Sequence, residues 1–260
     1  MNRTLGFSFV GGDRRMQWTK AALLEAGQQI VPLSHCTHLI LPLPAFRGGT
    51  VNGGPPLSQI LPELPRGTTV MGGLLEPHRE ELLAAGLIPV DYYLHEPLIA
   101  ENARLTAEAA IFLAAGQLSV TLENSSVLIA GWGRIGQLLA WKLKALGASV
   151  TVSARSPKDL GMIRALGFTP MVTGQWEDLS LYNIVYNTIP APVFLPRHME
   201  TAGEDCLFIE LASRPGFPEG GSRSIENAPG LPGIYAPETA GRLIGRTILE
   251  LCHPERRPYG

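Results

Sequence analysis

Residues 126–156 read SVLIAGWGRIGQLLAWKLKALGASVTVSARS, and this stretch decides the fold of the second half of the chain. The apolar run Val127–Ala130 predicts a buried strand. The turn Gly131-Trp132-Gly133-Arg134-Ile135-Gly136 follows, and Ile135–Leu146 predicts a helix that leads to a second strand at Ser149–Ser153. A glycine-rich turn between a strand and a helix is typical of a Rossmann unit, in which the turn binds a dinucleotide.

The three glycines of this turn have different expected tasks. Gly131 permits the tight turn, Gly133 lets the backbone approach a pyrophosphate, and Gly136 lets the helix pack against the strand. The pyrophosphate would lie on N–H groups at the helix N-terminus, where the helix dipole also favours negative charge. We therefore predict that all six residues of the turn bind the cofactor. The alternative is a Rossmann-like domain that has lost its ligand.

The end of the second predicted strand favours NADP. It reads Ser153-Ala154-Arg155-Ser156, without the Asp or Glu that usually accepts hydrogen bonds from the ribose of NAD. Arg155 can stack on adenine or pair with a 2′-phosphate, and both serines can donate hydrogen bonds to that phosphate. We predict that these four residues bind NADP(H). NAD(H) remains the alternative if Arg155 is only a solvated loop residue.

The remaining pattern predicts an α/β protein with two domains. In the first half, strands are predicted at 3–10, 29–33, 38–41, 69–71 and 87–91, and helices at 14–26 and 77–85. The Pro- and Gly-rich stretch 42–65 reads as an irregular loop. In the second half, strands are predicted at 168–172, 184–187 and 206–211, with a helix at 157–166 and at most a short helix at 176–179.

Two longer helices suggest how the domains are connected. An apolar helix predicted at 101–122 would suit an interdomain connector, and another is predicted at 237–251. We expect an N-terminal α/β domain at 1–104, the interdomain helix at 105–122, a nucleotide-binding domain at 123–236 and a C-terminal helix at 237–260.

Composition excludes several other classes of protein. The chain of 260 residues has 45% apolar and 17% charged residues and a formal net charge of −2, so neither disorder nor general affinity for nucleic acid is expected. No uninterrupted apolar stretch is long enough for a membrane span, and no signal peptide is evident. The three cysteines have neither zinc spacing nor an even count, which indicates a reducing cytoplasm and no metal site.

Further candidates follow the predicted strands, because ligands of open α/β sheets bind beyond the carboxyl ends of the strands. Asn187, Thr188, Ile189 and Pro190 are expected along the nicotinamide riboside. Arg214, preceded by Ser213, is the candidate for an anionic substrate group, with a structural ion pair as the alternative. Arg14 or Arg15 could serve similarly from the other domain, and at least one of them is an ordinary solvated helix residue. None of the six histidines has the context of a catalytic base.

The chain resembles the family formed by the A subunit of dipicolinate synthase in endospore-forming bacteria. The motifs that carry the resemblance span nearly the whole chain in the same order. They are FVGGDRR at 9–15, NARLTAEAAI at 102–111, GWGRIG at 131–136, LKALGA at 143–148, SARS at 153–156, NTIP at 187–190, ELASRPG at 210–216 and PGLPGIYAPETAG at 229–241.

The resemblance implies work with a second, flavoprotein-like polypeptide, the B subunit of dipicolinate synthase. Together they would oxidise dihydrodipicolinate, or its hydrated precursor, to pyridine-2,6-dicarboxylate in the cytoplasm of the mother cell. It also implies two Rossmann-like domains, as in alanine and D-2-hydroxyacid dehydrogenases. The second would be a doubly wound parallel sheet, and the last helix would return to the first domain. A homodimer is compatible with the sequence.

Carried onto this sequence, the resemblance makes Asn102, Thr106 and Glu108 candidates for the substrate cleft. Glu108 would pair with an arginine such as Arg214 or accept a proton, and the alternative is an exposed helix residue. Arg214, Glu108 and Asn187 are thus the catalytic candidates. Those for substrate binding are Arg14, Asn102, Thr106, Ser213 and Arg214.

The sequence also departs from the family pattern. Glu238 stands where a basic residue is expected in this family, and residues 217–227 lack a clear strand–helix unit. Two other functions stay open: an NADP-dependent oxidoreductase of the alanine or D-2-hydroxyacid dehydrogenase type, and a non-catalytic cofactor-binding partner subunit.

Overall fold

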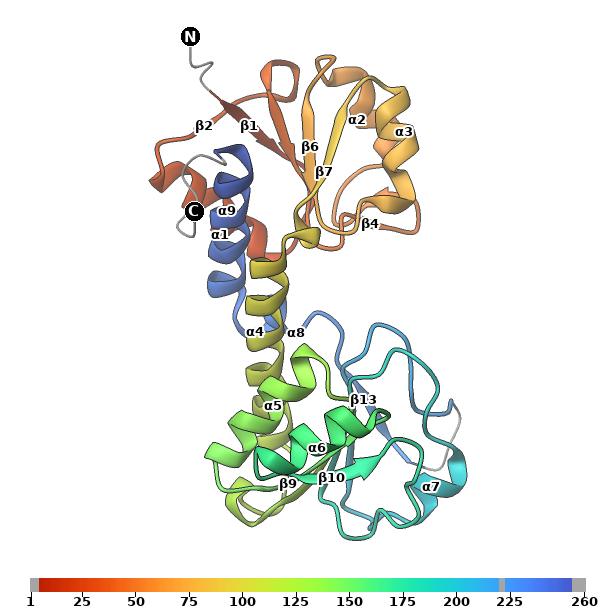
Figure 1. The fold of residues 1–260 in the computed structure, drawn as a ribbon. Helices are drawn as coiled ribbons and strands as arrows, with labels where there is room; N and C mark the ends of the chain where they lie inside the picture. Colours follow the sequence, from red (N-terminus) through yellow and green to blue (C-terminus); the bar gives the residue numbers. More distant parts are fainter. Residues whose placement is uncertain (1–4, 220–222, 254–260) are drawn as a thin grey trace. The chain divides into compact units, whose positions relative to one another are not determined.

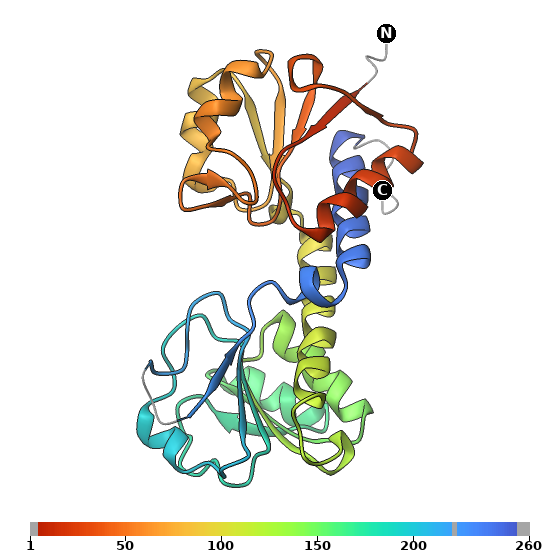
Figure 2. The same ribbon diagram turned by 180° about the vertical axis from the view of Figure 1, so that it is seen from behind.

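The computed structural model describes residues 5–219 and 223–253 (Figures 1 and 2). The chain divides into two compact units, one of Met1–Asn102 with Pro232–Gly260 and the other of Ala103–Leu231. Each unit is built on a parallel β-sheet. The start of the strand predicted at 3–10, part of the segment 217–227 and the end of the segment 237–260 lie outside the described residues.

The first unit contains a five-stranded parallel sheet in the order β2-β1-β3-β6-β7. Its central strands carry apolar residues on both faces, as expected where helices cover both sides of a sheet. The strands are β1 (Gly6–Phe9), β2 (Gln29–Ile30), β3 (His38–Ile40), β6 (Thr69–Gly72) and β7 (Ile88–Asp91), and the helices predicted near 14–26 and 77–85 are α1 (Arg14–Glu25) and α3 (Arg79–Ala84).

The last helix of the chain, α9 (Pro237–Cys252), returns to the first unit as the resemblance implied, and lies beside α1 in both views (Figures 1 and 2). Gly241 allows the close approach, because a Cβ there would lie 2.2 Å from the backbone oxygen of Arg15. The Thr19 hydroxyl then donates to the Gly241 carbonyl at 3.0 Å. The two helices, more than 200 positions apart in sequence, therefore pack backbone to backbone.

The stretch 42–65 is more ordered than an irregular loop. It contains a short hairpin, β4 (Phe46–Arg47) with β5 (Thr50–Val51), and one turn of helix, α2 (Leu57–Ile60). Val51, Leu57 and Ile60 are buried in the core of the unit. The Pro and Gly content predicts the turns correctly. It does not indicate that buried apolar side chains hold this stretch in place.

The second unit contains a six-stranded parallel sheet in the order β10-β9-β8-β11-β12-β13. Chain order reverses beside β8, so the sheet is doubly wound. The strands are β8 (Ser126–Ala130), β9 (Ser149–Ala154), β10 (Thr169–Val172), β11 (Ile184–Asn187), β12 (Leu207–Glu210) and β13 (Ile225–Asn227), and the first two crossover helices are α5 (Arg134–Ala145) and α6 (Pro157–Ala165).

Helix α4 (Glu96–Ala115) passes from the first unit into the second. It begins earlier than predicted, with Pro97 in its first turn, and it ends before Gly116 rather than at 122. Ala107, Ala110 and Ala114 form its fully buried stripe, whereas the Phe112 side chain is 70% exposed.

Other local predictions also differ from the structure. Residues 176–179 form no helix, and the Trp176 side chain is instead buried, with its Nε1 donating to the Val193 carbonyl at 2.8 Å. Besides β4, β5 and α2, the short elements α7 (Pro196–Glu200), α8 (Leu231–Tyr235) and β13 were not predicted. Among the residues that the structure describes, no helix combines the length and hydropathy that crossing a bilayer requires.

Candidate functional site

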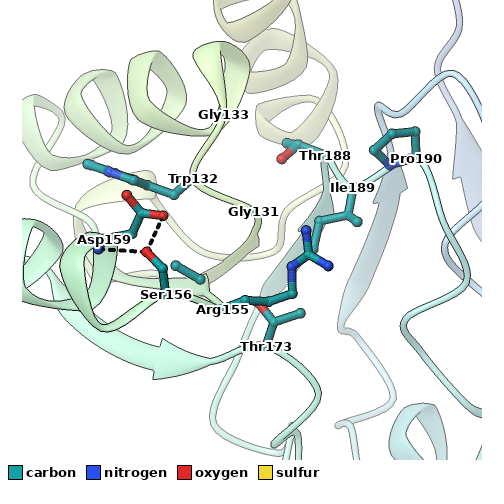
Figure 3. Close-up of a pocket in the computed structure, with 11 residues that line it drawn as sticks. Gly131, Trp132, Gly133, Arg155, Ser156, Asp159, Thr173, Thr188, Ile189 and Pro190 are labelled. Carbon is teal, nitrogen blue, oxygen red and sulfur yellow. Dashed lines mark hydrogen bonds between the residues drawn. The ribbon is translucent and has the colours of Figure 1, made fainter.

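A cavity of about 640 Å³ lies at the carboxyl ends of β8, β9 and β11 in the second unit (Figure 3). Its position matches the edge where open α/β sheets bind ligands. The lining residues are Gly131, Trp132, Gly133, Ala154, Arg155, Ser156, Asp159, Thr173, Thr188, Ile189 and Pro190. Nine of these eleven were expected from the sequence, and Asp159 and Thr173 were not. Arg134, Ile135, Gly136 and Ser153 were expected but do not line the cavity.

At two of the three glycines of the turn, neighbouring protein atoms leave no room for a side chain. Gly131 has a φ of +109°, and a Cβ there would lie 2.4 Å from the Thr188 hydroxyl. A Cβ on Gly136 would lie 2.2 Å from the Gly131 carbonyl oxygen. A Cβ on Gly133, by contrast, would meet nothing within 4 Å. Gly133 is therefore the glycine that faces open space in the cavity.

The N-terminus of α5 has the properties of an anion site. Gly133 is its N-cap and offers no side chain to accept hydrogen bonds from the first turn. The helix has 12 residues, so its dipole favours negative charge at this end. A pyrophosphate would fit here, because the cap lines the cavity and no side chain fills the space above it.

Ser153 is buried beneath the turn and does not reach the cavity. Its hydroxyl oxygen accepts hydrogen bonds from the Gly131 backbone N–H at 3.3 Å and from the Thr173 hydroxyl at 3.1 Å. The expected contact with the cofactor is therefore corrected: Ser153 holds the glycine turn against β9.

The two charged residues that line the cavity, Arg155 and Asp159, both follow β9 in the chain. Arg155 is exposed and extends toward Ile189, while Ser156 and Asp159 lie on the side of Trp132 (Figure 3). Ser156 caps α6 by accepting from the Asp159 N–H at 3.1 Å, and its hydroxyl donates to the Asp159 carboxylate at 2.7 Å. The sequence signal for Asp159 is the spacing of a Ser cap and an acidic residue three positions later.

Asn187 occupies a buried position between two strand ends rather than the cavity wall. Its side chain is fully buried, and its Nδ2 donates to the Glu210 carboxylate at 2.7 Å and to the Ile189 carbonyl at 2.9 Å. Direct contact with the nicotinamide is therefore corrected to positioning of the turn that follows β11.

Glu210 was not predicted as a functional residue, yet it organises the loop that carries Arg214. Glu210 is only 5% exposed, and its carboxylate accepts hydrogen bonds from the backbone N–H groups of Ala212 at 3.0 Å and Gly216 at 2.7 Å. The available signal was an acidic residue at the end of an apolar strand. Ser213 and Arg214 lie exposed between these anchored positions.

Arg214 and Glu108 do not pair with each other. Glu108 is exposed on α4 and forms an ion pair with Lys142 of α5 at 3.0 Å. The predicted partnership is thus corrected, because α5 brings an ammonium group beside the Glu108 carboxylate. Among the described residues, no acidic side chain forms an ion pair with Arg214.

The first unit places the adjacent residues Arg14 and Arg15 in different environments. Arg14 is exposed, whereas Arg15 is buried and donates to both oxygens of Asp13 and to the Leu43 carbonyl. Partial burial opposes ionisation of Asp13, but hydrogen bonds and the charge of Arg15 outweigh it and hold the pKa of Asp13 below its ordinary value. Arg15 is therefore structural, and Arg14 is the exposed cation.

The remaining candidates lie along α4 and α9. The Asn102 amide donates to the Tyr93 hydroxyl at 3.3 Å, and Thr106 is buried. Glu238 is paired with Arg242 at 3.0 Å one turn further along α9. In the part of the chain that the structure describes, no group of three His, Cys, Asp or Glu side chains could hold a metal ion.

Comparison with known proteins identifies relatives over nearly the whole chain. The chain is 31% identical over 235 residues to the A subunit of dipicolinate synthase from Bacillus subtilis, and the match covers 85% of this chain and 79% of that protein. The crystal structure of the corresponding A subunit from Bacillus halodurans superposes with a TM-score of 0.85 and 24% identity, over 96% of this chain and 98% of that chain.

A wider likeness concerns the fold alone. The transhydrogenase of Sinorhizobium meliloti superposes with a TM-score of 0.74 and 15% identity, over 96% of this chain and 94% of that chain. No family model matches the chain. The identity to the Bacillus subtilis protein and its coverage are sufficient to decide the family. The chain shares the fold of these solved structures and belongs to the family of the dipicolinate synthase A subunit.

Proposed function

We propose that this chain binds NADP(H) at the glycine turn and, with the flavoprotein-like B subunit of dipicolinate synthase, oxidises dihydrodipicolinate or its hydrated precursor to dipicolinate. The observation that carries the proposal is family membership combined with an open cavity at the uncapped N-terminus of α5. Arg155 supports NADP, since a guanidinium on the rim can pair with a 2′-phosphate. The cytoplasm of a sporulating mother cell is the proposed location.

The proposed substrate carries two carboxylates, and arginine matches a carboxylate with two parallel N–H donors. We assign Arg214 to one carboxylate and retain Arg14 as the candidate for the other. Ser213, Asn102 and Thr106 remain candidates for further contacts with the substrate. When bound, the nicotinamide would accept the hydride that leaves the ring. The chain's own contribution is then to hold the ring and to exclude water.

Of the described residues that line the cavity, Arg155 and Asp159 are the charged ones. Arg155 is a cation that extends toward Ile189, and the Asp159 carboxylate lies on the side of Trp132, where it accepts from Ser156, so neither is a ready proton acceptor beside Thr188–Pro190. Glu108 is exposed on α4 and engaged by Lys142. These observations favour, as a second candidate function, a cofactor-binding subunit whose catalysis requires residues of its partner.

Absorbance at 340 nm tests both candidates. Dihydrodipicolinate and NADP⁺ are mixed with this chain alone, with the B subunit alone and with both proteins. NADPH formed by the chain alone supports the enzyme, and NADPH formed only in the mixture supports a shared active site. Oxidation of alanine or of a 2-hydroxy acid instead would favour another dehydrogenase. Titration with NADPH and NADH decides the cofactor, and tighter binding of NADH would refute the NADP assignment.

A further inference from the structure

The cavity has an acidic group at the edge where the 2′-position of a dinucleotide is expected. Asp159 lines the cavity together with Arg155 and Ser156, the residues that follow β9. No residue of the Ser153–Ser156 stretch is acidic, yet helix α6 brings the Asp159 carboxylate back beside Ser156 (Figure 3). The cavity therefore presents a negative charge that the strand end itself lacks.

Asp159 engages the hydrogen of the Ser156 hydroxyl. Its oxygen accepts from the Asp159 backbone N–H at 3.1 Å, and its hydrogen is donated to the Asp159 carboxylate at 2.7 Å. A hydroxyl has one hydrogen to donate. Ser156 can therefore donate to a phosphate only after its hydrogen bond to the Asp159 carboxylate is broken.

The negative charge of Asp159 also opposes the binding of a 2′-phosphate. A 2′-phosphate beside α6 gains from the helix N-terminus and from Arg155, whose guanidinium is exposed and extends toward Ile189 rather than toward Asp159 (Figure 3). No ion pair between Arg155 and Asp159 occurs in the described structure. The carboxylate is thus free to repel a phosphate, whereas an unmodified ribose hydroxyl carries no charge to repel.

We propose that Asp159 is a specificity-determining residue that limits the preference of this cavity for a 2′-phosphate, by holding the Ser156 hydroxyl and by repelling the phosphate. The inference rests on the proposed function, since it requires a nicotinamide dinucleotide in this cavity. In this proposal Arg155 attracts the 2′-phosphate and Asp159 opposes its binding. Removing the carboxylate should therefore sharpen the preference for NADPH over NADH.

The test is isothermal titration calorimetry of NADPH and NADH with the full chain and with Asp159→Asn. Asn keeps the size of the side chain and removes its charge. We expect NADPH to bind about three- to tenfold more tightly to the variant and NADH to bind within twofold of wild type, as loss of one partly exposed charge allows. Glu200→Gln is the control, because it removes the same charge from an exposed position on α7 of the same unit.

Each other result has a defined meaning. An unchanged ratio of NADPH to NADH affinity would overturn the inference and leave the proposed function intact. A ratio that rises only because NADH binds more weakly would also overturn it, since the carboxylate would then be a ribose acceptor. If neither dinucleotide binds to wild type, the proposed function and the inference both fail.

Asp159→Ala, which removes the acceptor of the Ser156 hydrogen bond as well as the charge, is compared in wild type and in Ser156→Ala to separate the two effects. A smaller gain in that background supports competition for the hydroxyl, and an equal gain excludes it.

Discussion

The Asn187 amide donates a 2.7 Å hydrogen bond to the buried Glu210 carboxylate, and the two residues are also paired in register at the ends of β11 and β12. Through this bond one polar pair shapes two loops. The Asn187 Oδ1 accepts from the Ile189 N–H at 3.1 Å, and Glu210 accepts from Gly216, the residue two positions beyond Arg214. The same hydrogen-bonded pair therefore positions both the loop that lines the cavity and the loop that carries Arg214.

Replacement of Glu210 by Gln should destabilise the second unit. The Gln amide group cannot accept all the hydrogen bonds that the carboxylate receives from Asn187, Ala212 and Gly216, so at least one buried N–H loses its partner. We expect unfolding by urea to report a loss of about 2–4 kcal/mol. Glu226→Gln on the neighbouring strand β13, where the side chain is exposed, should change stability little. Equal losses in the two variants would show that the network contributes nothing special.

Gly136→Ala should be far more harmful than Gly161→Ala, although both glycines lie within helices. The new methyl group at 136 would lie 2.2 Å from the Gly131 carbonyl oxygen, a backbone atom that cannot move without opening the turn. At 161 it would meet nothing within 4 Å, so the higher helix propensity of Ala should stabilise α6 by roughly 0.5–1 kcal/mol. Thermal unfolding of the two variants measures the contrast, and similar melting temperatures would contradict it.

Gly133→Ala separates binding from folding. The φ of −81° suits alanine, and the added Cβ would meet no protein atom within 4 Å, so the melting temperature should fall only by the modest amount that Ala costs at an N-cap. The methyl group would instead occupy the space proposed for the pyrophosphate and weaken the binding of NADPH and NADH alike. Calorimetric titration measures both affinities, and unchanged binding would mean that the dinucleotide does not lie on this turn.

Predictions from the sequence succeed where the signal is local. The run Val127–Ala130, the glycine turn and the helix after it are adjacent in the chain, so β8 and α5 are found within a residue or two. The prediction is poorer for β13, which has only three residues, of which two are exposed. It is also poorer for α4, whose boundaries were placed several residues too late.

In the candidate site, too, residues with a local sequence signal were predicted and residues that depend on tertiary contacts were not. The turn residues and Arg155 follow from motifs, whereas Glu210 gains its importance from an amide 23 positions away in the sequence. Ser153 illustrates the opposite error, because its place in the motif suggested a ligand contact and the pairing of β9 with its neighbours buries it. Sequence patterns indicate which backbone forms the cavity, but tertiary packing decides which polar side chains reach it.

Asp13→Asn should remove a stabilising interaction that depends on pH. The folded protein holds the pKa of Asp13 below its ordinary value through Arg15, so the ionised carboxylate stabilises the fold above the ordinary pKa. This contribution is lost as the pH falls through the lowered value. The variant should therefore be less stable than wild type at pH 7, by about 0.5–1.5 kcal/mol, since the partly exposed Asp13 carboxylate is screened by solvent, and the difference should narrow below about pH 4. Urea unfolding between pH 3 and 7 checks this, with exposed Asp205→Asn as the control.

Arg214→Ala should abolish turnover without affecting the fold or the cofactor. The side chain is exposed, forms no ion pair with the described residues and does not line the dinucleotide cavity, so its loss should change stability by no more than about 0.5 kcal/mol. If Arg214 binds a substrate carboxylate, Arg214→Lys should retain only part of the activity, because an ammonium group cannot reproduce the paired donors of a guanidinium. Steady-state kinetics with the B subunit present, together with NADPH titration, distinguish these effects. Full turnover by the Ala variant would assign the carboxylate to another residue, and loss of NADPH binding would instead place Arg214 at the cofactor.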